Sequence, residues 1–272
     1  MSRERLRHFT LLLPAGIFFA AFFLLPLGRL LLVGGSGPTG FAAYALIVTD
    51  AGYFSSLMAT LALAAATTAI TLIVSGIAGV FLQRNSFPGR PVLVAMLTLP
   101  LAFPGVVIGF MVIVLAGRHG LVGSLTMALM DERIVFAYSM AGLLMGYVYF
   151  SIPRTILTVM ATAEKLDPRL EEAARSLGAT SWQVVRDVII PALKPALISA
   201  GAISFATAMG AFGTAFTLAT RINVLPMVIY TEFTLQANIA TAAALSFVLG
   251  AVTWLALALA RTAAGASVAA AG

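Results

Sequence analysis

Long stretches without a charged residue alternate with short polar segments along most of the chain. An apolar run follows residue 8, and charged side chains are also absent at 51–83, 91–117, 134–153, 195–220 and 233–260. Each run can cross about 30 Å of hydrocarbon at about 1.5 Å per helical residue. The pattern therefore predicts an all-α integral membrane protein, a single transmembrane domain over 1–272. Its six transmembrane helices are expected at 9–33, 55–83, 91–117, 134–161, 195–220 and 238–261.

The composition supports a membrane protein and excludes a soluble one. Apolar residues make up 61% of the 272 residues and the mean hydropathy is +1.03, too apolar for one soluble core. The basic residues responsible for the formal charge of +6 cluster in certain loops, as membrane topology requires. The positive charge therefore indicates a membrane protein and not a nucleic-acid-binding protein. The absence of cysteine excludes disulfides and thiolate chemistry.

The first apolar run has two interpretations. Arg3, Arg5 and Arg7 precede it, as basic residues precede the apolar region of a signal peptide. The run is long and has no clear small-x-small cleavage site, which favours a retained first span. A cleaved signal peptide is the alternative.

The distribution of lysine and arginine predicts the orientation. With the N-terminus inside, inner segments carry eleven such residues and outer segments four, with Arg154 at an inner helix end. The positive-inside rule then places both termini and the loop at 164–192 in the cytoplasm. The inner residues are Arg3, Arg5, Arg7, Arg84, Arg90, Lys165, Arg169, Arg175, Arg186, Lys194 and Arg261, and the outer ones Arg29, Arg118, Arg133 and Arg221.

The cytoplasmic loop at 164–192 predicts two short helices that meet at a glycine. Asp167 is a good N-cap before Pro168, and an apolar stripe then runs to Gly178, where the first helix should end. Thr180 with Gln183 has the spacing of a capping box, and Trp182, Val185, Val188 and Ile189 supply an apolar face that Pro191 should end.

This loop resembles the EAA signature of the membrane subunits of binding-protein-dependent ABC importers. The spacing from Glu172-Ala173-Ala174 through Gly178 to Val188-Ile189-Ile190-Pro191 matches throughout, with only the usual Ile-x-Leu-Pro ending relaxed. An isolated EAA tripeptide is more often part of a surface linker whose glycine is a C-cap. Here the match extends over about twenty residues in a cytoplasmic loop of a polytopic protein, which favours the importer.

Two further segments, Leu99–Phe110 (LPLAFPGVVIGF) and Ala208–Leu218 (AMGAFGTAFTL), extend the resemblance. With Leu225-Pro226 and Ile229-Tyr230 they are similar to the spermidine/putrescine, iron, phosphonate, thiamine and sulfate/molybdate permeases, over about residues 55–261. The resemblance implies a type I ABC importer (MetI-like) fold with cytoplasmic coupling helices. It also implies two permease subunits, two ATPase subunits that hold ATP and Mg, and an extracytoplasmic solute-binding protein.

The resemblance makes the loop a coupling element that docks on the ATPase. Small side chains at Ala173 and Ala174 would let the backbones approach, Glu172 would meet a basic residue, and Gly178 would permit the reversal between helices. The implied coupling residues are Glu171, Glu172, Ala173, Ala174, Leu177 and Gly178.

Irregular backbone marks a candidate translocation pathway. Two prolines free backbone carbonyls in span three, which lipid tolerates only where protein or water satisfies them. Small residues in span five permit close helix approach, so helix packing is the alternative explanation of both stretches. The candidates are Pro100, Pro104, Gly105, Thr207, Gly210, Gly213, Thr214 and Thr217.

The sequence has no catalytic or metal-binding pattern of its own. It contains no GxxxxGK[ST], so ATP hydrolysis is expected on a separate subunit, and His8 and His119 lie far apart. All ten acids fall in predicted loops or helix ends, which argues against an ion-coupled secondary transporter or channel, and also against a membrane enzyme. The resemblance implies a bacterial inner-membrane protein that imports a small polar solute, such as a polyamine, aminoethylphosphonate, ferric iron or thiamine. Mixed charges on the outer side favour neither cation nor anion.

Overall fold

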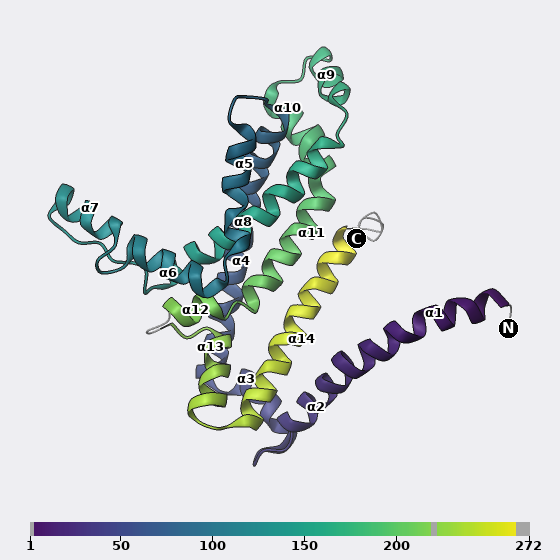
Figure 1. Cartoon of the computed structure of the whole chain (residues 1–272), viewed down its shortest axis with the longest axis vertical. Helices are drawn as coiled ribbons and strands as arrows, with labels where there is room; N and C mark the ends of the chain where they lie inside the picture. Colours follow the sequence, from purple (N-terminus) through teal and green to yellow (C-terminus); the bar gives the residue numbers. More distant parts are fainter. Residues whose placement is uncertain (1–2, 219–221, 265–272) are drawn as a thin grey trace. The chain divides into compact units, whose positions relative to one another are not determined.

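The helices begin and end where proline, glycine and capping side chains dictate. The computed structural model describes residues 3–218 and 222–264, with side chains at 11–218 and 222–262. Every regular element in these ranges is a helix (Figure 1). Arg221, the end of predicted span five at 219–220, and the side chains of Arg3, Arg5, Arg7 and His8 lie outside this description.

Nineteen helical segments follow one another in the described ranges, several joined end to end. They are α1 (Arg3–Phe19), η1 (Ala20–Leu24), α2 (Leu25–Gly34), η2 (Gly40–Ala45), α3 (Leu46–Thr49), α4 (Ala51–Arg84), α5 (Arg90–Thr98), η3 (Leu99–Ala102), α6 (Gly105–Ala116), α7 (Leu121–Met130), α8 (Met140–Glu164), α9 (Pro168–Ser176), α10 (Ser181–Val184), η4 (Val185–Ile189), α11 (Ile190–Met209), α12 (Gly213–Leu218), α13 (Leu225–Tyr230), η5 (Thr231–Leu235) and α14 (Ile239–Ala264).

Six stretches of these helices are long and apolar enough to cross a membrane, within the described residues. They confirm the number of predicted spans. Their ranges are Leu11–Gly34, Ala51–Arg84, Gly105–Met130, Met140–Glu164, Ser181–Met209 and Ile239–Thr262.

The chain divides into two compact units, whereas one domain over 1–272 was predicted. Met58–Met227, with the residues from Val252 onward, forms the larger unit, and the residues up to Leu57 with Val228–Ala251 form the smaller. Apolar helices gain little from packing together in lipid, because the hydrocarbon surroundings are as apolar as they are. The first span accordingly buries none of its most apolar stretch within the structure.

In the smaller unit, Glu232 is a buried carboxylate rather than a loop residue. It lies in the π-turn η5, where Tyr53 donates a 2.8 Å hydrogen bond to Oε1 and Asn238 donates one of 3.2 Å to Oε2. Both carboxylate oxygens are therefore satisfied by neighbouring side chains, so the group is part of the packing of this unit.

The prediction of one continuous third span at 91–117 is wrong. The helix α5 passes into the 3₁₀ turn η3, the backbone becomes extended at Phe103 and Pro104, and α6 begins at Gly105. Proline has no N–H for the helix and disfavours helical backbone at the preceding residue, so Pro104 separates two helices too short to span alone. The apolar stretch of spanning length is Gly105–Met130.

Spans four and five also differ from the predicted boundaries 134–161 and 195–220. The helix α8 begins at Met140, after the N-cap Ser139, and Arg154 lies within it rather than at an end. Span five begins in the cytoplasmic loop at Ser181 and stops at Met209, where Gly210 interrupts it before α12.

Candidate functional site

The helix α9 has the ends that its sequence predicts. Asp167 Oδ1 accepts a 3.0 Å hydrogen bond from the Arg169 N–H, with Pro168 in the first helical position. At the other end Gly178 has φ +87°, its N–H bonds Arg175 O, and Ala179 N–H bonds Ala174 O, both at 3.0 Å. This pair of bonds forms a Schellman motif, which depends on a left-handed residue that glycine adopts without strain.

The second helix starts as predicted but does not end at Pro191. The Thr180 backbone N–H donates to Gln183 Oε1 at 2.7 Å and Gln183 N–H bonds Thr180 Oγ1, which completes the capping box. The chain then passes through the π-turn η4 into α11, with Pro191 near the start of α11. The wider turn, in which Ile190 N–H bonds Val185 O, accommodates a residue without an N–H, so loop and span five form one helical path.

The loop is anchored to three spans of the larger unit. Val184 and Ile189 are buried against Val159 and Ala163 of α8 and Leu193 of α11, and this cluster also receives Ala174, Ala179 and Val80. The Arg84 guanidinium, at the inner end of α4, pairs with Glu171 of α9 at 2.5 Å between Nη2 and Oε1. The position of α9 therefore depends on spans two, four and five.

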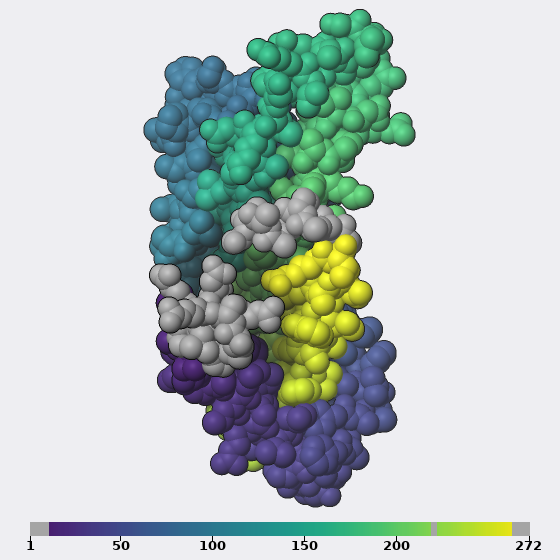
Figure 2. All heavy atoms as spheres, turned by 90° about the vertical axis from the view of Figure 1, so that its right-hand side faces the viewer, coloured from purple at the N-terminus to yellow at the C-terminus, as the bar shows by residue number. Residues whose placement is uncertain are grey.

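The anchored loop leaves one apolar face without a partner in the described chain. Leu177 is 90% exposed and Trp182 67%, next to exposed Glu172, Ala173 and Gly178. Figure 2 shows the green segment that contains α9 and α10 at one end of the chain's larger unit, with its outer surface open. The sequence grouped Trp182 with Val185, Val188 and Ile189 on one apolar face, whereas the structure leaves Trp182 exposed and buries Val184 together with Ile189.

The predicted coupling residues thus divide into two groups. Glu171 is half-buried in its ion pair and Ala174 packs on the cluster, so both position the loop. Glu172, Ala173, Leu177 and Gly178 lie on the open face.

The second candidate site lies where the breaks in spans three and five meet. In Figure 1, α12 lies beside α6, and Thr214 Oγ1 donates a 2.9 Å hydrogen bond to Gly105 O. Thr217 Oγ1 lies 3.0 Å from Gly213 O and 3.3 Å from Val106 O. Side chains of α12 thus serve the irregular backbone of span three, as the physics of lipid-embedded backbone requires.

A tyrosine of α8 serves the break in span five. Tyr147 donates its hydroxyl to Ala211 O at 2.6 Å, next to Gly210. Thr214, which is only 3% exposed, therefore does not present a free hydroxyl donor to a solute, because its proton already bonds a carbonyl. The same holds for Thr207, which donates to Ile203 O at 2.8 Å.

Glycines bring α6, α8 and α12 into close contact. A Cβ on Gly213 would lie 3.1 Å from the Val106 nitrogen, and one on Gly109 would lie 2.6 Å from Thr217 Cβ. A Cβ on Gly146 of α8 would meet Thr214 Cγ2 at 2.9 Å. Side chains at these positions would force the helices apart.

A cavity of about 260 Å³ opens beside these contacts. Five of the predicted pathway residues line it, whereas Pro100, Pro104 and Thr217 do not. Its lining carries hydroxyl groups and no charge, and consists of Gly105, Val106, Tyr147, Phe150, Ser151, Thr207, Ala208, Gly210, Ala211, Gly213 and Thr214. The three α8 residues in this lining, Tyr147, Phe150 and Ser151, were not among the predicted residues, since only the fold brings α8 to the breaks.

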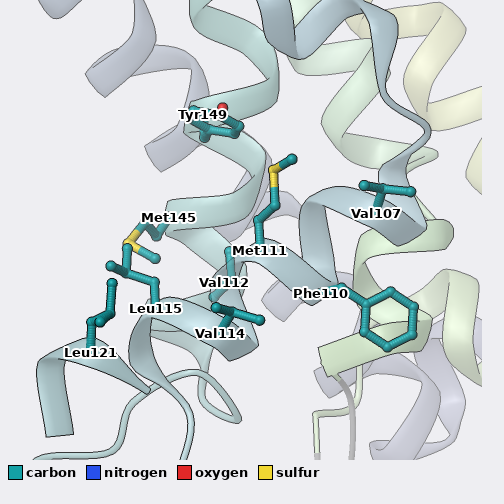
Figure 3. A pocket seen from close by; sticks show the side chains of 9 residues that line it. All are labelled: Val107, Phe110, Met111, Val112, Val114, Leu115, Leu121, Met145 and Tyr149. Carbon is teal, nitrogen blue, oxygen red and sulfur yellow. The ribbon is translucent and has the colours of Figure 1, made fainter. Parts of the chain in front are cut away.

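A larger hollow of about 510 Å³ lies between α6, α8 and the start of α7 (Figure 3). Its lining is apolar except for the hydroxyl of Tyr149, and includes Phe110, Val114 and Met145. A surface of this kind suits lipid or another apolar helix and offers nothing to a polar solute. The smaller cavity is therefore the better candidate for a pathway.

Comparisons with known proteins agree with this architecture. The family described as binding-protein-dependent transport system inner membrane component matches residues 75–267. The chain is 33% identical over 226 residues to the sulfate transport system permease protein CysT of Escherichia coli (strain K12), covering 81% of this chain and 78% of that protein. It is 34% identical over 155 residues to the molybdenum transport system permease protein ModB of the same strain, covering 55% and 66%.

A solved structure shares the fold. The chain superimposes on a bacterial ABC transporter involved in the import of the acidic polysaccharide alginate with a TM-score of 0.78, over 96% of both chains, at 16% identity. The family match covers most of the chain and includes the capped loop and both breaks. The chain therefore belongs to the inner membrane components of binding-protein-dependent transport systems, and it is a multi-pass permease subunit of an ABC importer.

Proposed function

We propose that this permease imports a tetrahedral oxyanion of the sulfate or molybdate type. Relatives named for sulfate and for molybdenum transport support this choice. The cavity beside the breaks carries the argument, because its lining contains no carboxylate. A polyamine, thiamine or ferric iron would need negative charge there, so the cavity favours an anion over those solutes.

The proposed transporter contains partners for each step. Two ATPase subunits with ATP and Mg dock at the open face of α9, a second permease, identical or similar, completes the pathway, and an extracytoplasmic binding protein delivers the solute. One of the solved relatives is described as a complex with an alginate pentasaccharide-bound periplasmic protein, which supports the last partner. This permease subunit itself carries out no catalysis in this scheme.

Uptake into proteoliposomes tests the solute class. The complete transporter, purified with its ATPase and binding protein, should accumulate radiolabelled sulfate or molybdate only when ATP is enclosed. Excess unlabelled oxyanion should compete, while spermidine and thiamine should not. Uptake of labelled spermidine or thiamine, with no uptake of either oxyanion, contradicts the proposal.

Cysteine labelling tests the proposed orientation, with both termini in the cytoplasm. The chain has no native cysteine, and Ser36 and Ser181 are both exposed. In intact cells a membrane-impermeant thiol reagent should label Ser36→Cys, and it should label Ser181→Cys only after the membrane is opened. Labelling of both from outside contradicts the topology.

A further inference from the structure

Arg154 places a positive charge in the middle of a spanning helix. It lies ten residues before the end of α8 at Glu164, a rise of about 15 Å. A helical side chain leans toward the helix N-terminus, which in the proposed orientation points away from the cytoplasm. Arg154 Nη1 accordingly reaches Thr207 Oγ1 on α11 at 3.4 Å, three residues before Gly210.

No carboxylate in the described chain neutralises this charge. The ion pairs there are Arg84 with Glu171 and Arg186 with Asp187, and Arg154 belongs to neither. Of the five N–H donors of its guanidinium, one makes a hydrogen bond to a described residue, a long one. An unpaired arginine at membrane depth is expensive unless it faces water or a ligand.

A buried hydroxyl next to Arg154 also lacks a partner. Ser204 of α11 is 5% exposed, and its Oγ makes no hydrogen bond with any described group. Ser204 and Arg154 line a small cavity of about 10 Å³, enough for roughly one water. Phe150, Ser151 and Thr207 line both this cavity and the one of about 260 Å³, so the two adjoin.

We infer that Arg154 and Ser204 form an anion-binding station at the side of the larger cavity. The Arg154 guanidinium reaches Thr207, which lines both cavities, so its remaining N–H groups can approach an oxyanion in the larger cavity, and the Ser204 hydroxyl would reach that anion through the water that the small cavity can hold. The solute itself would occupy the larger cavity, since the small one holds only about a water. This inference rests on the proposed oxyanion import, and it assigns selection for negative charge to one residue of the permease.

Uptake by variants is the first test. Arg154→Gln should lower sulfate uptake at least about tenfold in the reconstituted transporter, as expected when a hydrogen bond between charged groups is lost. Arg154→Lys keeps the charge and should retain more uptake than Arg154→Gln. Arg261→Gln, at the end of α14, is the matched control and should transport normally. Normal uptake by Arg154→Gln overturns the inference.

Charged thiol reagents give a test that does not require sulfate to be the solute. Gly210 lines the larger cavity, and a Cβ there meets nothing nearer than Ala206 O at 3.8 Å, so Gly210→Cys is a tolerated probe. With Arg154 present, the cysteine at 210 should react faster with an anionic methanethiosulfonate than with a cationic one, and the ratio of these two rates is the quantity measured. Arg154→Gln should lower that rate ratio by roughly threefold or more.

The two measurements separate the inference from the proposed function. If the wild-type transporter takes up neither oxyanion while the rate ratio still depends on Arg154, oxyanion import fails and the anion station stands for another anion. A ratio unchanged by Arg154→Gln, or a cysteine that reacts with neither reagent, overturns the station. If Arg154→Gln does not assemble, the rate ratio is compared in Arg154→Lys instead, with and without millimolar sulfate. If sulfate does not protect the cysteine at 210 from the reagents, the result counts against the anion-binding station.

Discussion

Valine in place of Gly178 should lower both binding-protein-stimulated ATP hydrolysis and uptake, while the protein still inserts in the membrane. Gly178 has φ +87°, and a β-branched residue in that region is strained by about 1–2 kcal/mol. A Cβ there meets no atom within 4 Å, so the strain is entirely in the backbone. The chain can relieve it only by giving up the Schellman motif that orients α9 against α10. We expect binding-protein-stimulated ATPase activity and uptake to fall at least about tenfold, measured in proteoliposomes.

Asparagine at the same position provides the matched control. Asn adopts left-handed backbone far more readily than valine, so Gly178→Asn should keep most of the coupling. If Gly178→Val transports as well as the wild type, the left-handed turn does not matter for coupling. Equal loss in both variants points to the surface of the residue rather than its backbone.

Leucine at Gly213 should destabilise the contact between α6 and α12 and so the assembled permease. A Cβ at Gly213 would already approach the Val106 nitrogen to 3.1 Å and Cγ2 to 3.2 Å, and leucine adds three more carbons. Overpacking of this kind costs about 1–3 kcal/mol, and the hydrogen bond from Thr214 to Gly105 adds about 1 kcal/mol if it breaks. The detergent-solubilised complex should melt several degrees lower and lose uptake.

Gly250→Leu is the control, since a Cβ at Gly250 meets nothing within 4 Å and leucine has the higher helix propensity. It should melt close to the wild type. A Gly213→Leu complex that keeps its melting temperature but no longer transports would show that this contact opens during transport and is not a fixed packing contact.

The coupling loop could be predicted from sequence because its signals are local. Asp167, the Thr180–Gln183 pair and Gly178 act within a few residues of themselves, and each cap appears where the sequence places it. The number of spans follows from the apolar runs for the same reason. A hydrophobic run, however, marks how much chain is apolar and not where a helix breaks.

The remainder depends on distant segments. Thr214 bonds a carbonyl 109 residues earlier in the chain, and Tyr147 bonds one 64 residues later, so neither role is visible locally. Pro191 was predicted to end a helix, but the π-turn η4 just before it lets the helical path continue into α11. Arg154 was predicted at an inner helix end, whereas it lies ten residues before the end of α8.

The helical path from Ser181 to Met209 has a mechanical consequence. Its 29 residues form a rod about 43 Å long that begins beside the open face of α9 and ends at Gly210. A rigid helix transmits tilting as well as movement along its axis. A small displacement of its cytoplasmic end therefore moves the cavity wall at its other end. The π-turn near Pro191 is a compliant point along it, so in the proposed transporter its stiffness would set how much of a movement at the cytoplasmic end reaches the cavity.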